Sequence, residues 1–341
     1  MKKAILLIID GLGDLPTPKT PLQAAKIPNF DKLAKNGITG LMSPIKPFVV
    51  PGSDTSHLQI LGYDPAVYYC GRGPLEALGL GIVLKDGDVA FRANFATAKD
   101  GKIIDRRAGR VDTKTAALLS RDLSMKIEDV EIVFKNSMEH RGVLVLHGPG
   151  LSPKVTATDP HSSMNVQQCI ALSAEAEKTA RIINEFTRES VTRLIQAKEN
   201  QHREKPANIV LLRGAGNFKQ VATFAQRFRI NGACVAGGAL YKGVSRYIGM
   251  DVLNVTGATG EKNTDLKAKA NAAVDGLKTH EFVFVHVKGC DSAGHDGDFK
   301  TKKEMLERID KEMLPILIRS SAYIVITGDH STPVSRKAHS G

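Results

Sequence analysis

The chain has 341 residues, of which 42% are hydrophobic and 24% charged, so it is long enough for two globular domains with substantial cores. Its 47 basic and 36 acidic residues give a net charge of +11, which suits a small anionic substrate. The basic residues are dispersed, aromatic residues make up 5% and tryptophan is absent, so we expect no nucleic-acid partner. No apolar run approaches the roughly 20 residues that span a bilayer, so we expect no membrane partner either.

The N-terminal run AILLII follows two lysines and therefore looks superficially like a signal peptide. The run is short and ends in Asp10 rather than in a small-residue cleavage site, which favours a buried strand. The four cysteines, Cys70, Cys169, Cys234 and Cys290, are scattered and form no CxxC pair. This pattern favours a reducing, cytoplasmic compartment over a disulfide-rich one.

The elements predicted along the chain divide it into two regions. The patterns predict a helix over 27–37, a strand over 38–45, a helix that opens at Ser53, a glycine-rich hinge over 71–81, a hairpin over 88–109 around Asp100-Gly101, a second antiparallel pair in VEIVFKN and HRGVLVLHG, and a charged helical stretch over 165–203. After Pro206 helices and strands alternate, as in a mostly parallel sheet covered by helices, and the last predicted pair is a long helix over 301–320 and a strand over 322–327. We therefore expect an α/β domain, residues 1–71 and 206–341, interrupted by an α+β insertion over residues 72–205.

Ser53 stands at the mouth of a predicted helix, in the stretch VVPGSDTSHLQILGYD over residues 49–64. As a capping residue, its hydroxyl would accept a hydrogen bond from a free backbone N–H of the first turn. As a nucleophile, it would benefit from those N–H groups and from the positive end of the helix dipole. The stretch alone leaves both interpretations open.

Acidic residues follow three apolar runs that predict strands. Asp10 ends the first run, Asp291 follows a second and has His295 four residues later, and Asp329-His330 ends a third. In open α/β sheets the ligand site lies at the carboxyl ends of the strands, so these groups are expected to meet. With His339 nearby, the side chains suit one or two divalent ions: Mn²⁺, Zn²⁺ or Fe²⁺, with Mg²⁺ an option at an oxygen-rich site. Beside such ions the hydroxyl of Ser53 would become nucleophilic.

Several blocks of the sequence resemble the alkaline phosphatase superfamily, and within it the archaeal-type 2,3-bisphosphoglycerate-independent phosphoglycerate mutases. The blocks are PGSDTSHLQILGYDP, GRGPLEALG, FRANFAT, DRRAGR and VAGGALYKGVSRYIGMD, together with the acidic strand ends. The resemblance covers essentially the whole chain. It implies an alkaline-phosphatase-like, mostly parallel sheet between helices with an inserted substrate-binding domain. It also implies a glycolytic isomerase that interconverts 3-phosphoglycerate and 2-phosphoglycerate through a phosphoserine, with two divalent ions and without bisphosphoglycerate.

The resemblance assigns roles residue by residue. The implied ligands are Asp291, His295 and His339 for one metal ion, and Asp10, Ser53, Asp329 and His330 for the other. Ser53 matches the residue that becomes phosphorylated, and Lys242 matches a lysine near that nucleophile. The implied substrate residues are Arg106, Arg107 and Arg110, with Asp159 and His161 as candidates for proton transfer. In isolation the three arginines of DRRAGR could equally form a solvated face, although guanidinium groups bind both phosphate and carboxylate.

The C-terminus departs from the family pattern, because members usually continue beyond the region of His339 and this chain stops at Gly341. We therefore expect the C-terminal end of the α/β domain to be truncated. A metal-dependent phosphatase or phosphopentomutase on the same scaffold is the alternative within enzymes. The non-enzymatic alternative is a basic binding protein with a structural metal site. The sequence leaves the identity of the metal and a homo-oligomeric state open.

Overall fold

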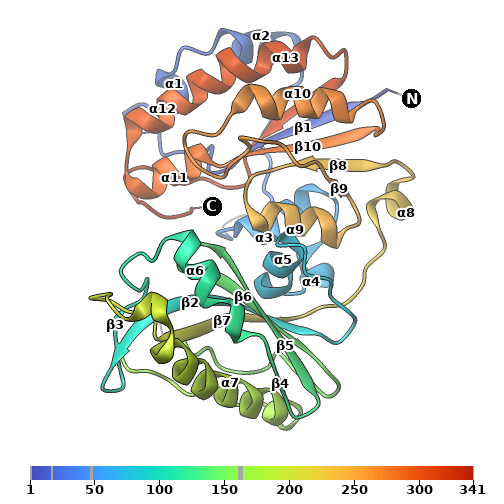
Figure 1. The fold of residues 1–341 in the computed structure, drawn as a ribbon. Coiled ribbons are helices and arrows are strands. Elements are labelled where there is room, and N and C mark those ends of the chain that lie inside the picture. Colours follow the sequence, from blue (N-terminus) through green and yellow to red (C-terminus); the bar gives the residue numbers. More distant parts are fainter. Residues whose placement is uncertain (1, 17, 47–48, 160–163, 341) are drawn as a thin grey trace. The chain divides into compact units, whose positions relative to one another are not determined.

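The computed structural model of the protein describes residues 2–16, 18–46, 49–159 and 164–340 (Figure 1). The chain divides into two compact units, Met1–Tyr69 with Val221–Gly341, and Cys70–Gln220. The second crossing between the units therefore lies near residue 220 and not at Pro206, where the sequence placed it. The reason is strand β7 (Ile209–Asn217), which pairs antiparallel with strand β2 (Val89–Lys99) and so belongs to the second unit.

The first unit contains a parallel five-stranded sheet with the order β11-β1-β10-β8-β9. Its strands are β1 (Ala4–Ile9), β8 (Gly232–Val235), β9 (Asp251–Val252), β10 (Phe282–Val287) and β11 (Tyr323–Thr327). Strand β1 lies between β10 and β11, with Ala4 in register with both Phe282 and Tyr323. The short apolar runs form strands because β1 and β10 are buried on both faces.

Helices cover both faces of this sheet, with α2, α10, α12 and α13 on one face and α3 and α9 on the other (Figure 1). The helices of the unit are α1 (Pro21–Ala24), α2 (Pro28–Asn36), α3 (Ser53–Ile60), α4 (Pro65–Tyr68), α8 (Phe224–Phe228), α9 (Ala239–Tyr247), α10 (Leu266–Gly276), α11 (Gly289–Asp296), α12 (Phe299–Arg308) and α13 (Leu314–Ile318). Alternate residues of β1, such as Ile5 and Leu7, pack with Leu306 and Leu314 in the core of the first face. None of the described helices is long and apolar enough to cross a membrane.

Two predicted elements of this unit differ in the structure. Residues 38–45 form no strand, and the side chains of Ile38 and Leu41 are fully exposed. Gly40 and Pro44 interrupt this run, and none of the described strands pairs with it. No sheet therefore stabilises an extended conformation of these residues. The long helix predicted before β11 is broken between α12 and α13 by a π-helical turn over Ile309–Met313, which precedes Pro315.

The second unit contains an antiparallel sheet. Its path runs β3-β2-β6-β5-β4, and β7 pairs with β2 off this path. The remaining strands and main helices are β3 (Lys102–Asp105), β4 (Met125–Ile127), β5 (Val130–Met138), β6 (Arg141–His147), α5 (Arg72–Gly79), α6 (Thr113–Leu119) and α7 (Glu177–Gln196). The predicted hairpin is confirmed: β2 and β3 pair across Asp100 and Gly101, both with positive φ. The predicted helical stretch 165–203 shortens to α7, whose Ile182 and Phe186 join the core of this unit.

Candidate functional site

The carboxyl ends of three neighbouring parallel strands carry the acidic residues of the first unit. Asp10 directly follows β1, Asp291 lies in the first turn of α11 after β10, and Asp329 follows β11 by one residue. Because β1 lies between β10 and β11, the three carboxylates meet at one edge of the sheet. Asp10, Asp291 and Asp329 are all nearly completely buried.

A first cluster of ligand atoms surrounds the imidazole of His330. Its Nε2 lies 3.3 Å from Asp10 Oδ1, 3.2 Å from Asp329 Oδ2 and 3.2 Å from Ser53 Oγ. Ligand atoms that each lie about 2.1 Å from one ion are about 3.4 Å apart in a tetrahedral arrangement. The carboxylates of Asp10 and Asp329 and the imidazole of His330 thus have the spacing of a metal site.

Two carboxylate oxygens of this cluster lack donors: Asp10 Oδ1 and Asp329 Oδ2 are buried without a hydrogen-bond partner in the described part of the chain. Burial, and then the negative charge of Asp10, raise the pKa of Asp329 well above its ordinary value. Burial also acts to raise the pKa of Asp10, but the Lys288 ammonium and the nearby imidazoles of His286 and His330 hold it well below its ordinary value. A divalent cation would satisfy both oxygens and remove the repulsion between the two carboxylates, so the residues fit a metal ion.

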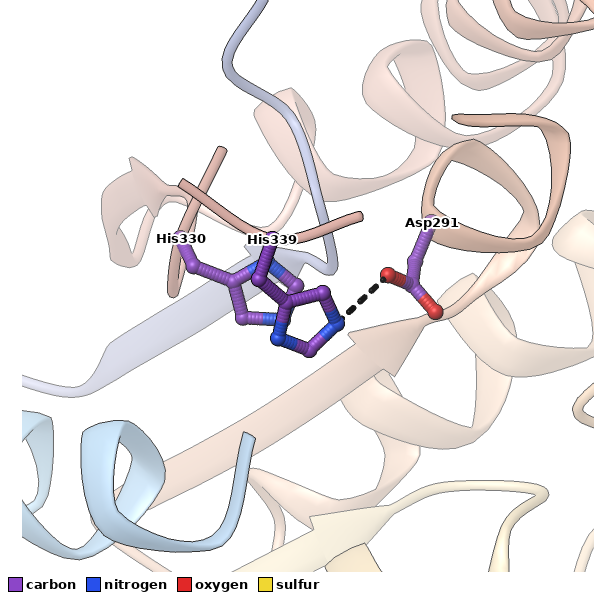
Figure 2. Close-up of side chains that lie close together, drawn as sticks. All are labelled: Asp291, His330 and His339. Carbon is purple, nitrogen blue, oxygen red and sulfur yellow. Dashed lines mark ion pairs between the residues drawn. The ribbon is translucent and has the colours of Figure 1, made fainter. Parts of the chain in front are cut away.

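A second cluster lies around Asp291. Its Oδ1 is 3.3 Å from His295 Nε2 and 3.3 Å from His339 Nε2. Figure 2 shows His339 reaching Asp291 and its ring lying against that of His330, and the two ring centroids are 3.7 Å apart. The two clusters are therefore adjacent. All seven residues that the sequence analysis assigned to the two metal ions lie at this edge of the sheet.

The environment of Ser53 excludes simple helix capping. Ser53 is the first residue of α3, Gly52 is the capping residue, and among the described residues no hydrogen bond joins the Ser53 hydroxyl to a backbone N–H of the first turn. The hydroxyl of Ser53 instead points to His330, while its carbonyl oxygen lies 2.6 Å from His57 Nδ1. Burial and then the charge of His286 lower the pKa of His57 to about 3, so this ring is neutral and donates from Nδ1. The helix start therefore presents Ser53 to the first cluster.

Three residues that the sequence reasoning missed orient Asp10. Its Oδ2 accepts a hydrogen bond from the Tyr241 hydroxyl and lies 3.1 Å from His286 Nε2 and 3.3 Å from Lys288 Nζ. Lys288 Nζ also lies 2.6 Å from Asp291 Oδ2, so it joins both clusters. These donors occupy Oδ2 and leave Oδ1 to face His330. His286 and Lys288, which precede Asp291 in VHVKGCDSAGH, were the available signal.

Lys242 lies in α9, directly after Tyr241, and is partly buried. No hydrogen bond between its ammonium group and Ser53 is found among the described residues. Helix α9 packs against α3, and it contributes Tyr241 to the cluster. The assignment of Lys242 as a catalytic lysine stays a prediction.

In the second unit, Asp159 is the centre of a group of basic side chains. Arg106 forms an ion pair with its Oδ1, and Arg213 Nε lies 3.5 Å from its Oδ2. Arg107 and Arg110 follow in the same loop and are exposed. His161 lies outside the described residues. The structure thus pairs Arg106 with Asp159, two of the residues that the sequence singled out, and adds Arg213 from β7.

A further acid–arginine group, which the sequence did not predict, involves Glu76 of α5. Glu76 Oε1 lies 2.9 Å from Arg72 Nε and 3.0 Å from Arg92 Nε. Burial is the largest effect on the pKa of Arg92 and lowers it, and the charges of Arg72 and Arg213 lower it further. Glu76 acts to raise it, but the pKa still falls to about 10. Four arginines thus surround two carboxylates, which leaves surplus positive charge for an anion.

A family profile and the similar curated proteins name one family. The family profile described as "2,3-bisphosphoglycerate-independent phosphoglycerate mutase" matches residues 34–200. A relative from Methanocaldococcus jannaschii, named 2,3-bisphosphoglycerate-independent phosphoglycerate mutase 1, is 46% identical over 353 residues, which cover 99% of this chain and 86% of that protein. A relative from Thermoplasma volcanium, named 2,3-bisphosphoglycerate-independent phosphoglycerate mutase, is 47% identical over 351 residues, which cover 100% of this chain and 86% of that protein.

Two solved structures are also similar. A Pyrococcus horikoshii protein has a TM-score of 0.87 and 37% identity, covering 99% of this chain and 85% of that chain. The cofactor-independent phosphoglycerate mutase of Thermoplasma acidophilum has a TM-score of 0.72 and 40% identity, covering 96% and 87%. Since identities well above 30% extend over nearly the whole chain, the chain belongs to the family of 2,3-bisphosphoglycerate-independent phosphoglycerate mutases.

Proposed function

We propose that the protein interconverts 3-phosphoglycerate and 2-phosphoglycerate, without bisphosphoglycerate, through a phosphoserine at Ser53. The observation that carries this proposal is the position of the Ser53 hydroxyl, 3.2 Å from His330 Nε2 beside two buried carboxylate oxygens without donors. Membership of the family supports the substrate and the isomerase activity, because the relatives are named for this reaction. An alkaline-phosphatase-like origin of the parallel sheet is part of the same proposal.

The metal sites follow from the two clusters. Asp10, Ser53, Asp329 and His330 would hold one divalent ion, and Asp291, His295 and His339 the other. When bound, such ions lower the pKa of a neighbouring hydroxyl and neutralise phosphoryl charge. The mixture of carboxylate and imidazole ligands suits Mn²⁺, Zn²⁺, Fe²⁺ or Mg²⁺.

The reaction requires two phosphoryl transfers at one serine. Ser53 Oγ attacks phosphorus, the Oγ–P bond forms, and the bond between phosphorus and the C3 oxygen of 3-phosphoglycerate breaks. The Ser53 hydroxyl loses its proton in this step, and the C3 oxygen takes one up. In the second transfer the C2 hydroxyl of the retained glycerate loses its proton and its oxygen attacks the phosphoserine, so the Oγ–P bond breaks and Ser53 Oγ takes up a proton. Placement at the N-terminus of α3 favours this chemistry, since the free N–H groups there attract phosphoryl oxygens.

Glycerate retention is assigned to the basic side chains of the second unit. Arg106 is the first candidate because Asp159 orients it, and Arg213 shares that carboxylate. A guanidinium group can bind the glycerate carboxylate through two parallel hydrogen bonds. Arg107, Arg110 and His161 remain predictions from the family resemblance, as does proton transfer by Asp159.

The decisive experiment is an assay of 3-phosphoglycerate conversion without added bisphosphoglycerate, with metal-free protein and with protein reconstituted with Mn²⁺. We expect 2-phosphoglycerate only after reconstitution. Release of inorganic phosphate as the main product would instead identify a phosphatase. A cytoplasmic location stays a prediction from the cysteine usage.

A further inference from the structure

Helix α12 carries a lysine that is completely buried. The side chain of Lys302 has an exposed fraction of 0%. Its ammonium group lies 2.8 Å from Gly13 O, 2.9 Å from Asp14 Oδ2 and 2.9 Å from Thr332 O. An ammonium has three protons, so each is used in one hydrogen bond within the protein. Burying this charge is unfavourable unless all its protons are bonded, and here they are.

The three acceptors belong to the two loops that carry the first cluster of ligand atoms. Gly13 and Asp14 lie in the loop that begins with Asp10, and Thr332 lies in the loop that begins with Asp329 and His330. The same loops also bond directly to each other: Thr332 N donates to Gly13 O at 3.2 Å, and Val334 N donates to Asp14 Oδ2 at 3.2 Å. Lys302 therefore ties together two segments that are about 320 positions apart in the sequence.

Thr332 extends this connection to the second cluster. While its carbonyl oxygen accepts from Lys302, its hydroxyl lies 2.9 Å from Asp291 Oδ1 and 3.1 Å from His330 Nδ1. A ligand residue of each proposed ion is thus held by one threonine. The outer hydrogen bonds of ligating carboxylates and imidazoles fix their orientation toward a metal.

Backbone from two neighbouring segments lies close to Thr332. A Cβ atom built on Gly11 would lie 2.6 Å from Thr332 Oγ1, and one built on Gly294 would lie 2.3 Å from Thr332 O. Backbone from the loop after β1 and from α11 therefore approaches Thr332 on two sides. A displacement of the Thr332 carbonyl group would also move the Thr332 hydroxyl and so disturb its contacts with Asp291 and His330.

We propose that Lys302 is a positioning residue that aligns the ligands of both proposed metal ions through Gly13, Asp14 and Thr332. It touches neither substrate nor ion, and it acts by fixing where the two loops meet. This inference rests on the metal sites of the proposed function. Neighbouring α12 residues Met305 and Leu306 are apolar and buried, so packing alone would be served by a methionine at position 302.

The test is Mn²⁺ binding by Lys302→Met, measured on metal-free full-length protein by the electron paramagnetic resonance signal of free Mn²⁺. We expect Mn²⁺ affinity to fall by about ten- to a hundredfold, since that is the usual loss when outer hydrogen bonds to metal ligands are removed. The Mn²⁺-induced rise in melting temperature should shrink in parallel. Both readouts are independent of catalytic activity.

Two matched variants separate positioning from general destabilisation. Lys303→Met makes the same chemical change one residue further along α12, where the lysine is partly exposed and pairs with Glu307 at 2.8 Å. Leu306→Ala removes a fully buried side chain of the same helix but no hydrogen bond to the two loops. Both should bind Mn²⁺ as the wild type does, although Leu306→Ala should melt at a lower temperature.

Unchanged Mn²⁺ affinity in folded Lys302→Met would overturn the inference and leave the proposed function standing. Failure of the wild-type protein to bind Mn²⁺ would overturn the metal sites and this inference together. If Lys302→Met does not fold, Asp14→Ala removes one of the three acceptors and leaves the ammonium two. We then expect at least threefold weaker Mn²⁺ binding, and wild-type affinity in Asp14→Ala would overturn the proposal.

Discussion

The two units of the molecule bury charged groups in opposite ways. In the first unit, Asp10 and Asp329 each keep one buried oxygen without a donor in the described part of the chain. In the second unit, Asp159 and Glu76 are each met by two guanidinium groups. In the first arrangement the Lys288 ammonium faces the three carboxylates of Asp10, Asp291 and Asp329, whereas in the second four guanidinium groups face two carboxylates.

This contrast indicates which kind of ligand each region can take. Buried carboxylate oxygens without donors are costly, and a divalent cation is the partner that satisfies several at once. Clustered guanidinium groups repel one another, and an anion with a carboxylate or a phosphate relieves that repulsion. A phosphoglycerate and metal ions together provide these ligands, which is why the contrast supports a phosphoryl-transfer enzyme more strongly than either region alone.

The largest expected effect comes from Ser53→Ala. The variant should have no measurable mutase activity, because the attacking oxygen is gone. Its melting temperature should change little, because Gly52 and not Ser53 occupies the capping position of α3. Enzyme kinetics and thermal unfolding check the two parts, and mass analysis of acid-quenched wild-type protein should find phosphate on Ser53.

Ser56→Ala is the control for that experiment. Ser56 lies one turn further along α3, and its hydroxyl donates to Gly52 O at 2.7 Å, so it makes only a local bond. This variant should keep most of its activity. Near-normal turnover in Ser53→Ala would refute the phosphoserine mechanism and leave the first unit as a metal-binding structure of another kind.

Removal of divalent ions should have the next largest effect and should act on the first unit. A chelator should abolish activity, and added Mn²⁺ should restore it. At a metal concentration of about 100 times the dissociation constant, one bound ion stabilises the folded state by about 2.7 kcal/mol, so the melting temperature should rise on reconstitution. Full activity in protein shown by elemental analysis to be metal-free would contradict the assignment.

Patterns in the sequence indicated the candidate metal ligands of the first unit because these residues carry local features. Each of Asp10, Asp291 and Asp329 follows an apolar run, and the rule that parallel strands end at one edge brings them together. Tyr241 and Thr332 could not be found in this way. Their roles depend on contacts across more than 40 residues, such as that of Tyr241 with Asp10, which periodicity does not reveal.

The fold shows the same limit. The parallel sheet and both antiparallel pairs of the second unit were predicted, because their strands carry the expected apolar patterns. The domain boundary was misplaced at Pro206, because β7 reads as an ordinary apolar strand and only its pairing with β2 assigns it to the second unit. Residues 38–45 carry a strand-like composition, yet without a partner strand they remain irregular.

Arg106→Ala tests the second unit and should have a smaller effect than loss of Ser53. Charge-assisted hydrogen bonds contribute about 1.5–3 kcal/mol, so kcat/KM should fall by about ten- to a hundredfold. Because the loop of Arg106 is largely polar, the protein should stay folded. Arg106→Lys should recover only part of the loss, since an ammonium cannot make two parallel bonds to one carboxylate.

The result for Arg106→Ala also tests whether the arginines around Asp159 bind the anionic substrate or form only a structural ion pair. If kcat/KM in Arg106→Ala equals that of the wild type, Asp159 and Arg106 form only a structural ion pair. Arg110→Ala is a useful comparison, because Arg110 is exposed in the same loop and no contact of its side chain with Asp159 is found among the described residues. A loss in Arg106→Ala that exceeds the loss in Arg110→Ala would point to the residues around Asp159 as the anion site.

The smallest effect concerns the pH dependence of stability, through a histidine of the second unit. Burial and then the charges of Arg141 and Arg107 lower the pKa of His140 to about 4, whereas an unfolded histidine titrates near pH 6.5. Between these values the unfolded chain binds a proton that the folded chain does not. The free energy of unfolding should therefore decrease as pH falls from about 6.5 to 4 and then level off. Urea unfolding of the wild type and of His140→Gln at pH 7.0, 5.5 and 4.5 checks this, because carboxylates titrate in both proteins and cancel in the difference. The advantage of wild type over variant should shrink as pH falls. A difference that stays constant with pH would show that burial and the charges of Arg141 and Arg107 do not lower the pKa of His140 in the folded protein.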